Sequence, residues 1–376
     1  MVIVVGNGVA GYACARALAV AGAAVTLVGP GPVVDRPPLS KQSLVDGRLR
    51  VLADSGRLAA EGIRAVDARA CSVEVDERAV TLEDGTRLEG SELVLAIGLD
   101  YSPPSLSGLE SALVTARPDE CERAAALLTD LSARVVIVGG GLIGCETAAA
   151  LGQSGHTVTL LELADEPLPG RDAELRGVAR AALTESRVRF AGGVSVLGMQ
   201  RHGEALVVEV AGASPQPADL VIAAVGGRAL LPPGAEFLGS GPVVVDASMR
   251  ASGVYVIGDL AVPLHQHFGR VRSPHWDTAL RTAEVAARAI LGEPAPTWEQ
   301  VPYWWSDLGR HRIAEYGYAE AVREWDAPLG GVRYGRDEDA AVVCARVIDA
   351  PRRAREARNI VAAALELRAP ARDPRG

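Results

Sequence analysis

Two sets of glycines in this chain have the spacing that binds the pyrophosphate of a dinucleotide. In such a Gly-x-Gly-x-x-Gly motif the first glycine allows a tight turn, the second lets the backbone approach the pyrophosphate, and the third lets a helix pack closely on a strand. The anion then lies at the helix N-terminus, where free N–H groups and the helix dipole favour negative charge. The two sets are Gly6, Gly8 and Gly11, and Gly139, Gly141 and Gly144.

A single lysine stands out for its chemistry. Lys41 is the only lysine among 38 basic residues, and it ends the segment Arg36–Lys41, whose sequence is RPPLSK. A lysine kept against such a bias toward arginine indicates a compact ammonium donor in a confined site. The alternative is chance, because one lysine must fall somewhere.

The elements that must position these residues occur twice in the chain. Each glycine motif follows an apolar run, and each is followed by a mostly apolar stretch and then by a second short run, Val25–Leu27 in one case and Val158–Leu160 in the other. This repeat at a fixed offset predicts the duplication of one βαβ unit. The apolar start, with Arg16 as its only charge before Gly29, also permits a membrane span or signal peptide, but the glycine spacing and the lack of a basic leader argue against both.

Composition limits the class of protein. A chain of 376 residues with 48% hydrophobic content predicts two or three domains with a large core and no membrane span, and the net charge of -9 argues against a general nucleic-acid binder. The cysteines form neither a CxxC pair nor a metal-binding spacing, which predicts a reducing, cytoplasmic location, no redox disulfide, no metal site, and buried or inert thiols. They are Cys14, Cys71, Cys121, Cys145 and Cys344.

The rest of the chain predicts an α/β fold with two Rossmann-like domains and a small α+β C-terminal domain. Each unit carries an inserted hairpin, as Asp84-Gly85 and the alternation over 205–210 indicate, and each ends in an apolar strand that meets a glycine, Gly98 or Gly226. We expect the chain to return to its first domain after Gly226 and to close with a helix over 354–367. The expected boundaries are 1–116 with 227–298, 117–226, and 299–376.

These landmarks together resemble the FAD-dependent, NAD(P)H-linked ferredoxin reductases of bacterial oxygenase systems, the putidaredoxin, rubredoxin and biphenyl-dioxygenase reductase type. The resemblance covers nearly the whole chain, and its most specific parts are the RPPLSK segment and Trp305-Ser306-Asp307; the glycine motifs, Glu146 and Tyr255–Asp259 also match. It implies a glutathione-reductase-like flavoprotein with FAD in the first domain, spanning 1–116 and 227–298, and NADH in the second, spanning 117–226. FAD accepts a hydride in one step and releases single electrons in two.

The resemblance also implies the roles of individual residues. Lys41 would lie beside the reactive edge of the flavin and Glu146 at the nicotinamide end, and both are assigned to catalysis. The alternatives are an ordinary acid in a first helical turn for Glu146, a helix cap for Asp259, and core aromatics for the two tryptophans. The residues assigned to cofactor binding are Gly6, Gly8, Gly11, Arg36, Lys41, Gly98, Asp259, Trp276, Trp305, Gly139, Gly141, Gly144, Glu162 and Gly226.

The residue at the end of the second strand bears on coenzyme choice in the second unit, and in the first unit it departs from the family pattern. Glu162 ends the second strand of the second unit, where a carboxylate accepts hydrogen bonds from the adenosine ribose and repels a 2′-phosphate, so NADH is expected over NADPH. The alternative is that Glu162 caps the sheet edge and that Arg171 holds NADPH. The first unit has Gly29, followed by Pro30, where the family has an acidic residue for the FAD ribose.

The expected function is transfer of a hydride from NADH to FAD and then of single electrons to a 2Fe-2S ferredoxin that serves a monooxygenase or dioxygenase. Docking is expected at arginines that flank the tryptophans, with the C-terminal arginines forming a solvated helix face. One alternative is direct reduction of a small molecule or oxygen, and another is a redox sensor related to apoptosis-inducing factors. The lack of CxxC argues against a disulfide reductase. The docking arginines are Arg270, Arg272, Arg310 and Arg312.

Overall fold

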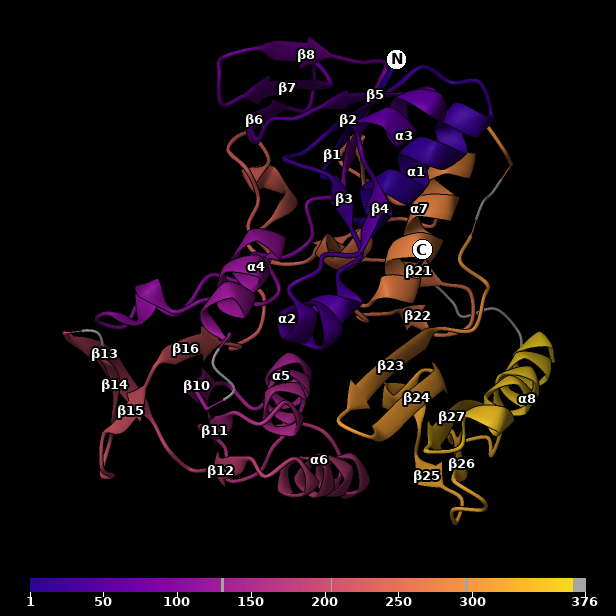
Figure 1. Cartoon of the computed structure of the whole chain (residues 1–376). Coiled ribbons are helices and arrows are strands. Elements are labelled where there is room, and N and C mark those ends of the chain that lie inside the picture. The colour runs from indigo at the N-terminus through magenta and orange to yellow at the C-terminus, as the bar shows by residue number, and fades with distance from the viewer. Residues whose placement is uncertain (130–131, 204, 295–296, 368–376) are drawn as a thin grey trace.

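The protein is described here by a computed structural model, which describes residues 1–129, 132–203, 205–294 and 297–367. Three larger sheets organise the chain (Figure 1): the N-terminal sheet lies at the top of the view, and the second and C-terminal sheets lie side by side below it. The last residues of the expected C-terminal domain, 368–376, lie outside the described residues.

The first sheet has six strands in the order β18-β19-β9-β1-β2-β5. Its centre is parallel, with Val2 paired to Val25 on one side and to Glu92 on the other. β19 joins β9 in parallel although it comes from a much later part of the chain, so the chain does return to this sheet. The helices α1 (Val9–Val20) and α7 (Trp276–Ile290) pack against each other beside it. The strands are β1 (Val2–Val5), β2 (Val25–Val28), β5 (Ile63–Val66), β9 (Glu92–Leu95), β18 (Arg250–Ala251) and β19 (Val254–Val256).

The second sheet repeats the local geometry of the first, which confirms the duplication. Gly6 and Gly139 both have φ of +107°, a value that glycine adopts without steric cost. An added Cβ would lie 2.3 Å from the Ala96 carbonyl oxygen at Gly6 and 2.4 Å from the Ala224 carbonyl oxygen at Gly139. The sheet order is β12-β11-β10-β16, and its elements are β10 (Arg134–Val138), α5 (Leu142–Gln153), β11 (Thr157–Leu161), α6 (Ala173–Glu185), β12 (Arg189–Ala191) and β16 (Leu220–Ala223).

Each unit carries a small antiparallel sheet of its own, as the alternating segments predicted. The turn at Asp84-Gly85 is formed, with Gly85 at φ +83° and its N–H donated to the Leu82 carbonyl. The strands of the first insert are β6 (Ala70–Glu74), β7 (Ala79–Leu82) and β8 (Arg87–Glu89). Those of the second are β13 (Val196–His202), β14 (Ala205–Val210) and β15 (Gln216–Ala218).

The C-terminal part is an antiparallel sheet in the order β23-β24-β27-β26-β25, covered by α8 (Ala354–Glu366). Its strands are β23 (Tyr303–Leu308), β24 (His311–Gly317), β25 (Glu324–Trp325), β26 (Val332–Arg336) and β27 (Val342–Ile348). The remaining α-helices are α2 (Gln42–Asp46), α3 (Ser55–Ala60) and α4 (Pro118–Leu127), and the first of several short 3-10 helices, η1, spans Pro37–Ser40. The remaining short strands are β3 (Val33–Val34), β4 (Val51–Ala53), β17 (Val243–Val244), β20 (Ala261–Val262), β21 (Leu264–His265) and β22 (Gly269–Arg270).

Candidate active site

One cavity of about 1020 Å³ runs between the two glycine motifs. Most residues predicted for the site line it: Gly8, Arg36, Lys41, Gly98, Gly139, Gly141, Glu146, Glu162, Gly226, Asp259, Trp276 and Trp305. The first and third glycines of the motifs serve the packing of helix on strand. A Cβ on Gly11 would lie 1.8 Å from the Gly6 carbonyl oxygen, and one on Gly144 would lie 1.9 Å from that of Gly139.

The two predicted catalytic residues meet in this cavity. Lys41 follows η1 in the first unit and Glu146 lies on α5 in the second, and Nζ of the lysine is 3.0 Å from Oε1 of the glutamate. The Glu146 carboxylate is almost fully buried and also accepts hydrogen bonds from Ser306 Oγ at 2.6 Å and Ser40 Oγ at 2.5 Å. Such a set of donors offsets the cost of burying the charge and fixes its position.

Aromatic side chains form one wall of the cavity. The rings of Trp276 and Trp305 meet edge to face with their centroids 6.0 Å apart, and the His275 ring lies 4.4 Å from that of Trp305. His275 Nε2 lies 3.1 Å from the Trp305 carbonyl oxygen and 3.4 Å from the Trp305 backbone nitrogen, so the neutral ring can donate to the first or accept from the second, according to its tautomer. Burial lowers the pKa of His275 to about 4, so the ring is neutral at pH 7.

Buried charge lies at another wall of the cavity. Burial raises the pKa of the Asp259 carboxyl, and the nearby positive charges of Arg272 and Arg36 oppose that rise. Arg272 also donates from Nη1 to the Asp259 carbonyl oxygen at 2.9 Å. Burial raises the pKa of Tyr101, in the same wall, to about 12, so this side chain remains a neutral phenol.

Glu162, the residue predicted to bind the adenosine ribose, directly follows β11 and lies on the cavity wall. Its Oε2 accepts the Gly140 N–H at 2.5 Å, and its Oε1 accepts the Ala164 N–H at 2.9 Å. Arg171, the residue of the NADPH alternative, also lines the cavity, and its guanidinium lies 5.0 Å from the ring centroid of Trp304.

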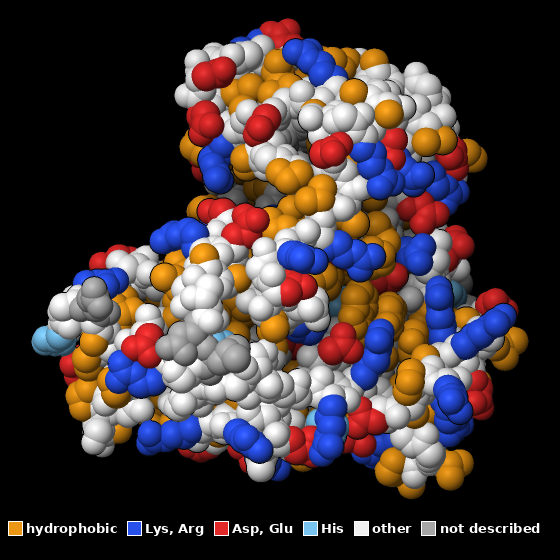
Figure 2. All heavy atoms as spheres, in the orientation of Figure 1, with side chains coloured by type: hydrophobic (Ala, Val, Ile, Leu, Met, Phe, Trp, Pro, Cys, Tyr) orange, Lys and Arg blue, Asp and Glu red, His pale blue; other side chains and the backbone are white. Residues whose placement is uncertain are grey.

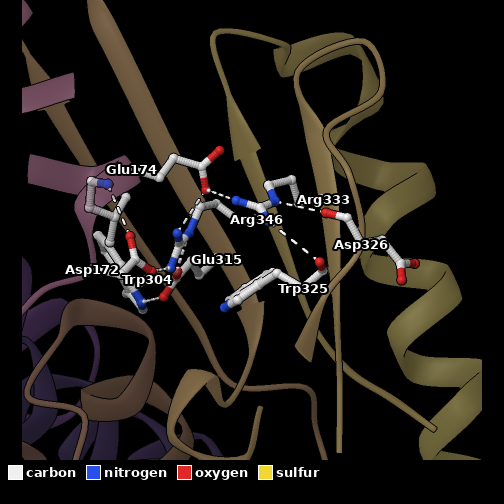
Figure 3. A network of polar contacts seen from close by, with 9 residues as sticks. Asp172, Glu174, Trp304, Glu315, Trp325, Asp326, Arg333 and Arg346 are labelled. Carbon is white, nitrogen blue, oxygen red and sulfur yellow. Dashed lines mark hydrogen bonds and ion pairs between the residues drawn. The ribbon is translucent and has the colours of Figure 1, made fainter. Parts of the chain in front are cut away.

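A polar network joins the C-terminal sheet to the start of α6, next to Arg171 (Figure 3). Its centre is Arg346, which is 3% exposed and donates to Glu315 Oε1 at 2.7 Å. The same guanidinium reaches Asp172 at 2.7 Å and Glu174 at 2.9 Å, both in the second unit. Trp304 Nε1 donates to the other oxygen of Glu315 at 2.7 Å. The C-terminal sheet is therefore attached directly to the start of α6, one residue after Arg171, which lines the cavity.

The structure changes part of the docking prediction. Arg272 lines the cavity and lies half-buried beside Asp259, so it does not belong to a docking rim as expected. Arg310 and Arg312 are exposed, and each has a carboxylate neighbour, Glu185 at 2.6 Å and Asp307 at 3.8 Å. Figure 2 shows arginines interspersed with acids over the region of β23–β27 and α8. The side chain of Arg270 donates to the Val245 carbonyl oxygen.

Sequence reasoning missed several residues of this site. His275 and Tyr101 carried no spacing signal, because their place on the wall depends on which loops meet there. Ser40 and Ser306 could have been found, since they lie inside the RPPLSK and Trp-Ser-Asp segments that the resemblance singled out. The cysteines were expected to be buried or inert thiols: Cys14, Cys121, Cys145 and Cys344 are buried, and Cys71 is exposed, so only the second alternative applies to it.

Comparisons with known proteins agree with this geometry. The sequence model of the pyridine nucleotide-disulphide oxidoreductase family matches residues 1–287. The chain belongs to this family. It is 32% identical, over 93% of its own length and 90% of the relative, to the ferredoxin reductase component of chlorobenzene dioxygenase from Cupriavidus sp. (strain PS12). It is 31% identical, with the same coverage, to the ferredoxin–NAD(+) reductase subunit of the benzene 1,2-dioxygenase system of Pseudomonas putida.

Solved structures show the same fold. The covalent putidaredoxin reductase–putidaredoxin complex matches with a TM-score of 0.84 at 24% identity, over 96% of this chain and 93% of that chain. The protein is thus an oxidoreductase of this fold whose cofactors are FAD and NAD(P)H. All five cysteines are unpaired in the described structure. Within the described ranges, no helix has the length and apolar character that crossing a membrane requires.

The residues present fit a flavin and a nicotinamide coenzyme. The cavity volume lies at the upper end of ordinary ligand sites, and a Cβ on Gly8 or Gly141 would meet nothing within 4 Å, so backbone is open to a pyrophosphate at both motifs. Two polar atoms of the aromatic wall, Trp276 Nε1 and His275 Nδ1, are buried and have no partner among the described residues. Such orphaned atoms require an explanation, and a bound ligand supplies one.

Proposed function

We propose that this protein is a cytoplasmic, NADH-dependent flavoprotein reductase that passes single electrons to a 2Fe-2S ferredoxin serving a monooxygenase or dioxygenase. FAD is assigned to residues 1–116 and 227–298, NADH to 117–226, and 299–376 to a C-terminal domain. The observation that carries the proposal is that residues of both glycine motifs line one cavity, with Lys41 and Glu146 in contact inside it.

The pair lies where the two nucleotide-binding units meet. η1 belongs to the first unit and α5, which follows β10, to the second, and they touch through Ser40, Lys41 and Glu146. When bound, FAD would supply the step from hydride transfer to single-electron transfer. The chain's own part is to hold an ammonium and a carboxylate where the reactive ends of the two nucleotides meet. Trp276 and Trp305 would shield this place from water.

A ferredoxin is favoured as acceptor by the relatives, which are reductase components of dioxygenase systems. The surface offers a route to the site. Arg312 is 52% exposed, its Nε lies 3.8 Å from Asp307, and the same carboxylate lies 4.0 Å from Lys41 Nζ. A partner docked at Arg312 would therefore be one side chain away from the residue assigned to the flavin edge. Electron-transfer contacts are small and depend on charge steering.

The test is steady-state turnover of the FAD-loaded protein with NADH under anaerobic conditions, with a 2Fe-2S ferredoxin or with ferricyanide as acceptor. We expect NADH to bleach the flavin and ferredoxin to be reduced catalytically. If NADH bleaches the flavin and no ferredoxin accelerates turnover at any salt concentration, while oxygen or a quinone does, the protein is a direct small-molecule reductase. If NADH leaves the flavin oxidised, the assignment of the second unit to NADH is wrong.

A further inference from the structure

The two nucleotide units differ at one pair of corresponding positions. In the second unit, the middle residue of the motif's turn is Gly140, and Glu162 stands at the end of the strand β11. In the first unit the order is reversed: Asn7 stands in the turn, and Gly29 follows the strand β2. The longer side chain therefore stands at the strand end in the second unit and in the turn in the first.

Steric crowding in both units disfavours side chains at the turn and at the strand end together. A Cβ on Gly29 would lie 2.5 Å from both Cγ and Oδ1 of Asn7, a distance that real Cβ atoms do not adopt. In the second unit, a Cβ on Gly140 would lie 3.1 Å from the Cβ and from Oε2 of Glu162. In the first unit a side chain at Gly29 would require Asn7 to move, and in the second unit a side chain at Gly140 would crowd Glu162. In the first unit the space beside the turn is occupied by the side chain of the turn residue, Asn7.

The orientation of the Asn7 amide follows from its partners. Nδ2 donates to the carbonyl oxygens of Pro30 and Gly31, both at 2.9 Å, so both amide hydrogens are used. The opposite orientation would place Oδ1 against two carbonyl oxygens and leave no donor for either, which excludes it. The loop is held from its other side as well, because Gly31 N–H donates to Asp67 Oδ1 at 2.8 Å. The side chain of Asn7 can offer a ligand only its acceptor, Oδ1.

We propose that Asn7 Oδ1 is the acceptor for the adenosine ribose hydroxyls of FAD, in place of the carboxylate that Glu162 provides in the second unit. A ribose hydroxyl needs an acceptor at this position, and an amide oxygen supplies one without charge. A neutral acceptor gives a weaker bond than a charged one, so the adenosine end of FAD is held less tightly than a carboxylate would hold it. The inference rests on the proposed assignment of FAD to the first unit.

The experiment titrates FAD into flavin-free protein and follows flavin fluorescence, with FMN as a second ligand because it lacks the adenosine. Asn7→Ala should weaken FAD binding about tenfold, the loss of roughly one hydrogen bond, and leave FMN binding unchanged. Gly29→Glu alone should weaken FAD binding at least about tenfold, since its Cβ meets Asn7. The double variant Asn7→Gly with Gly29→Glu, which copies the second unit, should bind FAD at least as tightly as the wild type.

Three outcomes would overturn the proposal. Unchanged FAD affinity in Asn7→Ala would show that Oδ1 contributes no bond to the ribose. An equal loss for FAD and FMN would show that Asn7 supports the fold of the first unit as a whole and has no specific role at the adenosine ribose. If Asn7→Ala weakened NADH binding and left FAD binding intact, the assignment of FAD to the first unit would be the part that is wrong.

Discussion

Lys41 Nζ lies 3.0 Å from Glu146 Oε1, and this contact joins the two nucleotide-binding units inside the cavity. Glu146 is buried and holds two further hydrogen bonds, so its position is fixed, whereas Lys41 is 22% exposed and can also approach Asp307. The pair thus consists of a fixed acceptor and a donor that a ligand can contact.

Replacement of Lys41 by alanine should slow flavin reduction by NADH at least about tenfold, because the ammonium group beside the flavin edge is lost. The buried Glu146 loses its cation and keeps its serine donors, so the free energy of unfolding should fall by about 1–3 kcal/mol. Anaerobic stopped-flow absorbance and urea unfolding measure the two effects. Arg48→Ala, at an exposed cation shortly after α2, is the control. Wild-type values in the Lys41 variant would remove it from the site.

Glu162→Ala should raise kcat/KM for NADPH relative to NADH by about tenfold or more, because the carboxylate that repels a 2′-phosphate is gone. The wild-type enzyme should prefer NADH. Initial rates with both coenzymes at one ionic strength measure this preference. Arg171→Ala tests the alternative: if it abolishes activity with NADPH while Glu162→Ala leaves the preference unchanged, Arg171 determines coenzyme choice.

His275 makes stability depend on pH. Its folded pKa is about 4, below the ordinary value of 6.5, so below pH 6.5 the unfolded chain binds a proton that the folded chain does not. The contribution of the neutral His275 ring to the free energy of unfolding is present at pH 7 and is lost as the pH falls. At pH 5 the free energy of unfolding is lower by about 2 kcal/mol on this account. His265, whose pKa burial also lowers to about 4, acts in the same direction. Between pH 7 and 5, the free energy of unfolding measured in urea should fall less for His275→Asn than for the wild type.

The matched control for that measurement is the exposed His202, replaced in the same way. His202→Asn should keep the wild-type dependence on pH. A wild-type slope in His275→Asn as well would show that the ring of His275 is accessible to protons in the folded protein.

Arg346→Met should lower the free energy of unfolding by about 3–5 kcal/mol, because Glu315, 1% exposed, is left as a buried charge without its cation. Adding Glu315→Gln should recover part of that loss by removing the unpaired charge. Arg333→Met is the control: this residue is 25% exposed, contacts Glu174 at 3.3 Å, and should cost about 1 kcal/mol or less. Equal losses in the two single variants would contradict a special role for burial at Arg346.

Arg312→Glu should slow reduction of ferredoxin severalfold and leave reduction of ferricyanide nearly intact, because only the protein acceptor needs a docking surface. Turnover of the wild type with ferredoxin should fall as salt rises, since screening shortens the reach of exposed charges. Arg355→Glu, an exposed arginine on α8, is the matched control and should resemble the wild type. A parallel loss with both acceptors would place the effect of Arg312 in the site instead of in docking.

The sequence by itself predicted the α/β class, the duplicated βαβ unit and a set of site residues most of which line the cavity. It could do so because these features are local: a glycine that must adopt φ of +107° or admit a helix leaves a fixed spacing, and an apolar strand leaves a run of buried residues. Composition alone also indicated Lys41 as a candidate site residue, because it is the only lysine of the chain.

Only the tertiary structure decided which of these residues act on one another. Ser40, Lys41, Glu146 and Ser306 come from three distant segments, and their contact depends on how the two units and the C-terminal sheet pack. The same holds for Arg272, whose basic side chain was expected on the surface and lies instead beside Asp259 in the cavity. Long-range packing sets burial, and burial sets whether a charge contacts a partner protein or a bound ligand, which local spacing does not encode.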